Sequence, residues 1–114
     1  MIHIDTTKED AFTVLTINGD VDASSSIQVD EAMKSAIENG AKLIIIACLH
    51  LNYISSAGLG VFMSYIEEIK ERGIKMALFG LNEKVMNVFE ILGLDQLLKI
   101  VNTKEEARGA VNEE

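Results

Sequence analysis

Seven consecutive apolar residues in the middle of the chain limit the folds that it can adopt. The run Leu43–Leu49 reads LIIIACL, and most of its side chains are branched. A strand with one face in water alternates apolar and polar residues, whereas a strand covered on both faces carries a continuous apolar run. The run is too short for an independent helix and far below the roughly 20 residues that cross a bilayer. It therefore predicts a strand buried on both faces of a sheet.

Strand and helix patterns alternate around this run. Two apolar stretches, Ile2–Ile4 and Ala11–Ile17, enclose the polar residues 6–10 and predict a hairpin. Later apolar stretches predict two further strands: Ile74–Phe79 and Leu97–Val101. Apolar residues at helical spacing, followed by glycine stops, predict three helices: Ile27–Asn39, Ser55 to about Arg72, and Asn82–Leu92. Thr103, with Glu106 three residues later, forms a capping-box pattern and predicts a short last helix.

This order of elements, ββαβαβαβα, indicates the fold class. Strands that alternate with helices need crossover connections, so the sheet is mainly parallel, and the opening hairpin adds one antiparallel pair. A chain of 114 residues is the size of one domain. We therefore expect an α/β fold in one small domain, with a mixed, mostly parallel sheet of about four or five strands and about four helices.

Charge and cysteine content exclude several classes of protein. Ten basic and eighteen acidic residues give a formal net charge of −8, and no cluster of Lys or Arg provides the basic patch of a nucleic-acid binder. The single cysteine, Cys48, excludes an internal disulfide and a cysteine-based metal site. The opening residues, MIHIDTTKED, are acidic where a signal peptide would be apolar. We expect a soluble, cytoplasmic protein without membrane insertion, metal or cofactor.

Two loops are placed to carry function, because ligands and partners of α/β folds bind beyond the carboxyl ends of the strands. They are residues 18–26 and 52–60, both rich in Ser, Gly and Asp. In the second loop, Ser55 or Ser56 is placed to cap the following helix, and Gly58 and Gly60 leave room for a backbone or a phosphate. A phosphate here would lie in the favourable field of the helix N-terminus and would change the surface charge without melting the helix. The alternative is that the serine only caps the helix and the glycines only permit a tight turn.

Enzymatic motifs are poorly matched. The segment SSAGLG lacks the Lys-Ser/Thr ending of a P-loop, and ISSAG around Ser56 differs from the Gly-x-Ser-x-Gly of a nucleophile elbow. His3 and His50 are expected at an edge or on the surface rather than as general bases. Asp20 and Asp22 are spaced like a possible metal pair, but two loop carboxylates are weak support, and capping or turn formation is the better expectation.

The segment YISSAGLGVF resembles the signature of bacterial anti-sigma-factor antagonists, the STAS-domain family, whose usual form is D-S-[ST/A]-G-L-G after a strand. Gly19–Asp22, which reads GDVD, resembles the family's Gly-acidic-aliphatic-Asp loop. The stretch from Gly80 to Leu94 resembles its G-x-N-x-x-V…L-G-L segment. Because the three motifs occur in the family's order in a chain of the right length, residues 1–114 are identified as one STAS domain.

The resemblance implies a protein-interaction module that regulates transcription, and no enzymatic activity. Members commonly bind an anti-sigma factor that is also a serine kinase, which frees a sigma factor for RNA polymerase. Phosphorylation of the signature serine ends this binding, and a serine phosphatase restores it. Carried onto this chain, the phosphoacceptor is Ser56. The resemblance places six residues near the docking surface: Asp22, Ser24, Ser55, Gly58, Leu59 and Met63.

One departure from the family pattern leaves alternatives open. Ser55 stands where the family usually carries Asp before the phosphoserine. The change would alter recognition by the kinase or supply a second candidate hydroxyl at Ser55 itself. The main alternative function is a STAS subunit of a larger signalling or transport assembly, with no serine switch. A remote alternative is a small nucleotide-binding or hydrolytic enzyme that uses the same loop.

Overall fold

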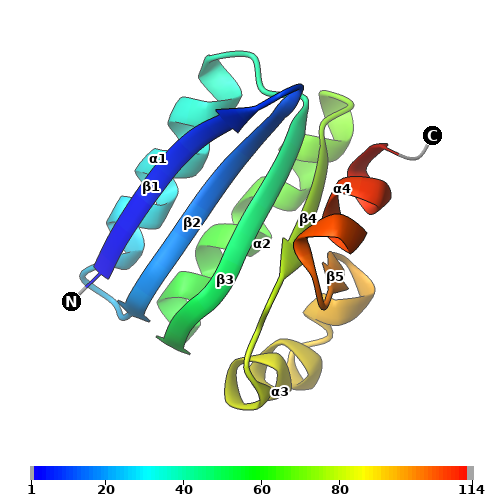
Figure 1. Cartoon of the computed structure of the whole chain (residues 1–114). Helices are drawn as coiled ribbons and strands as arrows, with labels where there is room; N and C mark the ends of the chain where they lie inside the picture. Colours follow the sequence, from blue (N-terminus) through cyan, green and yellow to red (C-terminus); the bar gives the residue numbers. More distant parts are fainter. Residues whose placement is uncertain (1, 113–114) are drawn as a thin grey trace.

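The computed structural model describes residues 2–112, in which five strands form one sheet with the order β1-β2-β3-β4-β5 (Figure 1). The first two strands are antiparallel, and every later neighbouring pair is parallel. The predicted mixed, mostly parallel sheet is therefore confirmed. The strands are β1 (Ile2–Glu9), β2 (Phe12–Val21), β3 (Leu43–Ile54), β4 (Lys75–Phe79) and β5 (Lys99–Val101).

Helices cover the two faces of this sheet unequally. α1 and α2 lie on one face, and α4 lies on the other, over β3, β4 and β5 (Figure 1). α3 packs on α2 through Phe89 and Phe62, whose ring centroids are 6.3 Å apart. None of the helices within residues 2–112 is long and apolar enough to span a membrane. The helices are α1 (Ser26–Glu38), α2 (Ser56–Glu71), α3 (Glu83–Ile91) and α4 (Lys104–Asn112), with a 3₁₀ turn at Leu94–Gln96.

The position of β3 in the middle of the sheet explains its continuous apolar run. Ile44, Ile46 and Cys48 belong to the core beneath α1 and α2, whereas Ile45 and Ala47 belong to the core beneath α4. Successive side chains of a strand point to opposite faces, so a strand covered on both faces needs apolar residues at every position. The prediction of a strand buried on both faces is confirmed for residues 44–48, whereas Leu49, the last residue of the run, is 63% exposed.

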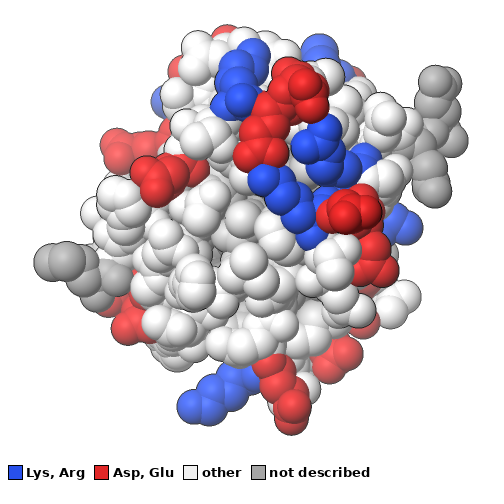
Figure 2. Space-filling model, in the orientation of Figure 1, with Lys and Arg blue, Asp and Glu red and all other residues white. Residues whose placement is uncertain are grey.

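Ion pairs connect α4, near the end of the described chain, to the hairpin of β1 and β2 at its beginning. Lys104 Nζ lies 2.7 Å from Glu9 Oε1, and Arg108 Nη2 lies 2.8 Å from Asp10 Oδ2. The Arg108 guanidinium also lies over the Phe12 ring, 4.5 Å from its centroid. Figure 2 shows positive and negative side chains interleaved on this part of the face, above a largely uncharged area in the centre of the view.

Several predicted boundaries are wrong in the same direction, because three strands are longer than expected. β1 extends to Glu9, β2 to Val21 and β3 to Ile54, so only Asp10 and Ala11 form the hairpin turn. Polar residues continue these strands because β1 is an edge strand and α4 leaves part of the second face uncovered. Register shifts between Thr16 and Asn18, and between Gly19 and Asp20, show that the added segments pair irregularly.

Candidate functional site

Two loops lie side by side at the carboxyl ends of β2 and β3. The strands are parallel neighbours, and Val21 and Ile54 at their ends are partners in the register. The N–H of Ser55 donates a 2.8 Å hydrogen bond to the Val21 carbonyl oxygen, which joins the loops directly. We call residues 22–26 and 53–57 the two-loop site.

Ser55 is the residue that caps α2. Its backbone is extended, with φ −86° and ψ 171°, and its hydroxyl oxygen accepts a 3.2 Å hydrogen bond from the Gly58 N–H. A capping side chain of this kind satisfies one of the N–H groups that have no partner within the helix. The sequence did not distinguish Ser55 from Ser56 as the capping residue, and the structure assigns the cap to Ser55.

Ser56 is the first residue of α2, and its side chain is exposed. Within residues 2–112 its hydroxyl makes no hydrogen bond, in contrast to that of Ser55. The first turn of α2 contains no acidic residue. A phosphate on Ser56 would therefore meet the positive end of the helix dipole without an opposing carboxylate from the same turn.

The two glycines of the signature have different surroundings. A Cβ at Gly58 would lie 2.6 Å from Val21 Cγ1 and 2.8 Å from Ile54 Cγ1, whereas a Cβ at Gly60 would meet nothing within 4 Å. Gly58 thus allows α2 to approach the ends of β2 and β3. Of the two uses expected for these glycines, room for a backbone or for a phosphate, Gly58 leaves no room for a phosphate, because its space is filled by the side chains of Val21 and Ile54.

Asp22 organises the loop between β2 and α1. Its Oδ1 accepts hydrogen bonds of 2.9 to 3.0 Å from the N–H groups and the hydroxyls of both Ser24 and Ser25. The Ser25 N–H, followed by the hydroxyls of Ser24 and Ser25, lowers the pKa of Asp22 to about 2. The expected turn-forming role of Asp22 is confirmed. Asp20 instead lies within β2, and no cluster of three metal-ligating acidic, His or Cys side chains occurs in the described part of the chain.

The six residues that the resemblance placed near a docking surface separate into exposed and buried groups. Asp22, Ser24 and Met63 are exposed, and Ser55 is half-buried. Gly58 and Leu59 are buried, and Leu59 belongs to the core beneath α1 and α2. Burial removes Leu59 from direct contact with a partner, so its part in docking would be to hold the first turn of α2 in place.

Two exposed apolar residues at this end of the sheet were missed by sequence reasoning. Ile27, in the first turn of α1, is 62% exposed, and Tyr53, near the end of β3, is 53% exposed. Ile27 opens the predicted helix as an apolar residue, but it lies outside the buried stripe of α1, which begins at Ser26 and continues through Val29 and Met33. A stripe at helical spacing that starts from Ser26 was the signal that places Ile27 outside it.

The two histidines lie away from the serines. His3 Nε2 lies 3.1 Å from Asp5 Oδ1 on the edge strand β1. His50 is exposed on β3, five residues before Ser55, a separation of roughly 16 Å at the rise of an extended strand. Their expected surface positions are confirmed, and neither lies where it would act as a general base for Ser56.

Comparisons with known proteins agree on one family. The model of the STAS domain matches residues 3–107. An anti-sigma-B factor antagonist of Listeria monocytogenes is 30% identical over 93 residues, which are 82% of this chain and 82% of that protein. Two solved structures are similar in fold. An anti-sigma factor antagonist from Mycobacterium paratuberculosis has a TM-score of 0.91 at 16% identity, over 99% of this chain and 96% of that one. The Bacillus cell fate determinant SpoIIAA in its phosphorylated form has a TM-score of 0.71 at 22% identity, over 98% and 100%.

Proposed function

The chain belongs to the STAS-domain family, and from this premise we propose that it is a phosphorylation-controlled antagonist of an anti-sigma factor. It binds an anti-sigma factor with serine kinase activity, which frees a sigma factor for RNA polymerase. Phosphorylation of Ser56 ends the binding, and a serine phosphatase restores it. The observation that carries the proposal is the exposed hydroxyl of Ser56 at the start of α2, which makes no hydrogen bond to any residue that the structure describes. Transcription takes place in the cytoplasm, so we propose that compartment for the protein.

The different roles of the two serines support Ser56 as the phosphoacceptor. The Ser55 oxygen accepts the Gly58 N–H and caps the helix, so modification there would disturb the cap. Ser56 bears no such bond within residues 2–112, and a kinase can reach its hydroxyl without breaking the fold. A phosphate adds about −1.5 to −2 charges at neutral pH, and the helix N-terminus tolerates this charge.

Exposed apolar side chains explain how one phosphate would switch off docking. Ile27, Tyr53 and Met63 belong to elements that begin or end at the two-loop site, and each is about half or more exposed. A partner that covers them would have to desolvate a phosphate at Ser56. Burying an uncompensated charge costs several kcal/mol, and each 1.4 kcal/mol lowers the affinity about tenfold.

Substitution of Ser56 tests the proposal. Ser56→Asp is expected to lower the affinity for the anti-sigma factor at least tenfold, while Ser56→Ala binds but is no longer phosphorylated. Ser64→Asp is the matched control, because it adds the same charge to an exposed position two turns further along α2. Unchanged binding by Ser56→Asp, with a normal circular-dichroism spectrum, would reject the switch.

A second function is favoured by Ser55 itself, which occupies the position of the family's usual Asp and caps α2. In this alternative the domain is a constitutive subunit of a larger signalling or transport assembly. Incubation with ATP in a lysate of the host, followed by mass spectrometry of Ser55→Ala and Ser56→Ala variants, separates the two functions. Phosphate on Ser56 supports the switch, whereas no phosphate on either serine, in a lysate that is active on a known family substrate, favours the constitutive subunit.

A further inference from the structure

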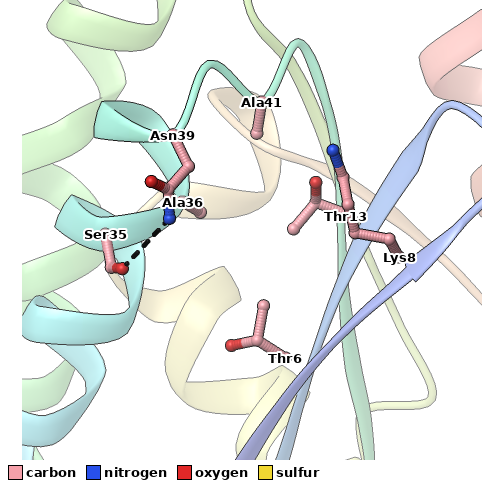
Figure 3. A pocket seen from close by; sticks show the side chains of 7 residues that line it. All are labelled: Thr6, Lys8, Thr13, Ser35, Ala36, Asn39 and Ala41. Carbon is pink, nitrogen blue, oxygen red and sulfur yellow. Dashed lines mark hydrogen bonds between the residues drawn. The ribbon is translucent and has the colours of Figure 1, made fainter.

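A pocket of about 400 Å³, lined by both polar and apolar side chains, lies at the opposite end of α1 from the two-loop site. α1 begins at Ser26 in that site, and its 13 residues carry the chain about 20 Å to the pocket. Figure 3 shows side chains of β1 and β2 on one side of the pocket and side chains of the end of α1 on the other. The lining residues are Thr6, Lys8, Thr13, Ser35, Ala36, Asn39 and Ala41.

The strand side of the pocket supplies hydrogen-bond donors that lack partners. Thr13 is only 5% exposed, yet its hydroxyl makes no hydrogen bond within residues 2–112. Thr13 lines the pocket, so a water or a ligand there can hydrogen-bond to its hydroxyl. The Lys8 ammonium, from the neighbouring strand, makes no ion pair with any of these residues. Thr6 adds a second hydroxyl on the same side (Figure 3).

The helix side of the pocket supplies further hydrogen-bond donors, and its backbone carbonyl oxygens are already hydrogen-bonded. The carbonyl oxygens of Ser35, Ala36 and Ile37 accept hydrogen bonds of 3.0 to 3.1 Å from the N–H groups of residues 39, 41 and 40 respectively. These bonds satisfy carbonyls that would otherwise repel an anion at a helix C-terminus. Ser35 and Asn39 face the pocket, where the Asn39 amide donates to the Ser35 hydroxyl at 3.5 Å (Figure 3). No carboxylate lines the pocket.

We propose that this pocket binds a small oxyanion, a carboxylate or a phosphate. Lys8 supplies the opposite charge, and the hydroxyls of Thr6, Thr13 and Ser35 donate to the oxygens. The volume is within the range of small-molecule sites. A neutral polyol would use the hydroxyls but would leave the ammonium of Lys8 without a counter-charge. The site requires neither Ser56 nor an anti-sigma factor, so it stands apart from the proposed function.

The proposal predicts an effect of a carboxylate outside the pocket. Glu31 is exposed, and it precedes Ser35 by one turn on the same stripe of α1. Its charge opposes an anion in the pocket, so Glu31→Gln is expected to tighten binding of an oxyanion. The same change would leave the binding of a neutral ligand unaltered.

Titration of the ¹⁵N-labelled protein, followed by amide chemical shifts, tests the site. The probes are inorganic phosphate, acetate and glycerol at constant ionic strength, which separate a phosphate, a carboxylate and a neutral polyol. Phosphate or acetate is expected to produce saturable shifts at Thr6, Thr13 and Asn39. Lys8→Met is expected to weaken this binding about tenfold, as for loss of one charge-assisted hydrogen bond.

Two controls keep the result decisive. Lys84→Met removes an exposed ammonium on α3, far along the chain from the pocket, and should leave the affinity unchanged. Thr13→Val keeps the shape of the side chain and removes only the hydroxyl, so it should weaken binding in a folded protein. Equal affinities of the wild type and Lys8→Met would overturn the proposal. So would shifts that never saturate, or equal binding of glycerol and the anions.

Discussion

A 2.8 Å hydrogen bond from the Ser55 N–H to the Val21 carbonyl oxygen joins the residue after β3 to the end of β2, 34 residues away in sequence. Through it, the cap of α2 is fixed relative to the end of β2, where the Asp22 loop begins. The position of Ser56 therefore depends on both loops, and a substitution in either loop is expected to shift Ser56.

The two glycines of α2 should respond in opposite directions to alanine. Gly58→Ala is expected to destabilise the fold by about 1–3 kcal/mol, because its Cβ would overlap with Val21 and Ile54. Gly60→Ala is the matched control and should stabilise by about 0.5–1 kcal/mol, since its Cβ meets open space in a helix interior. Urea unfolding measures both. Equal midpoints for the two variants would contradict the packing described for Gly58.

The two serines should separate stability from switching. Ser55→Ala is expected to cost about 1 kcal/mol, because it removes the side chain that accepts the Gly58 N–H. Ser56→Ala should change the free energy of unfolding by less than about 0.5 kcal/mol, since its exposed hydroxyl makes no bond within residues 2–112. Thermal or urea unfolding of both variants checks this. A larger loss for Ser56→Ala than for Ser55→Ala would show that the cap had been assigned to the wrong serine.

Stability in acid should depend on Asp22. The folded pKa of this carboxyl, about 2, is below its ordinary value of 3.8, so ionised Asp22 stabilises the fold above about pH 4. That contribution is lost as the pH falls through 2, because the folded carboxyl must then bind a proton. Asp22→Asn is expected to show a smaller drop in the urea midpoint between pH 5 and pH 2.5 than the wild type. Asp20→Asn serves as the control, and an identical drop in the wild type and Asp22→Asn would refute the prediction.

The single thiol should be inert in the folded protein. Cys48 is fully buried in β3, and burial raises its pKa to about 12. The thiolate is the reactive form, so alkylation by iodoacetamide at pH 8 is expected only after unfolding. Mass spectrometry before and after addition of urea measures the modification. Rapid labelling in native buffer would mean that β3 opens readily.

Local patterns in the sequence were the reliable guides to the fold. The capping box is confirmed, since the Glu106 N–H donates to Thr103 Oγ1 at 3.1 Å and the Thr103 N–H donates to Glu106 Oε1 at 3.0 Å. Asn82 caps α3 by accepting the Val85 N–H at 2.8 Å, as predicted. These signals succeed because the interacting residues lie within one turn of each other, so that spacing along the chain already fixes their geometry.

Strand ends and exposed positions were not predictable in the same way. Residues 18–21 and 52–54 fall in the two predicted loops because they are polar or mixed, but they belong to β2 and β3, where Asp20 pairs with Tyr53 and Val21 pairs with Ile54. The cap of α2 is Ser55 rather than its neighbour Ser56. Both residues are serines, so the sequence alone does not show at which of them the helix begins.

The amino-acid sequence by itself determined the order of elements, the buried central strand and the family signature. Hydrophobic periodicity and helix capping involve residues that are close together in sequence, so they can be recognised without the tertiary structure. Only the tertiary structure decided that Gly58 is packed and Gly60 is open, and that Ile27 is exposed. It also brought Lys8 and Thr13 on neighbouring strands to face Ser35 and Asn39. The physical reason is that these properties depend on contacts between residues far apart in sequence, which exist only after the sheet and its helices have packed.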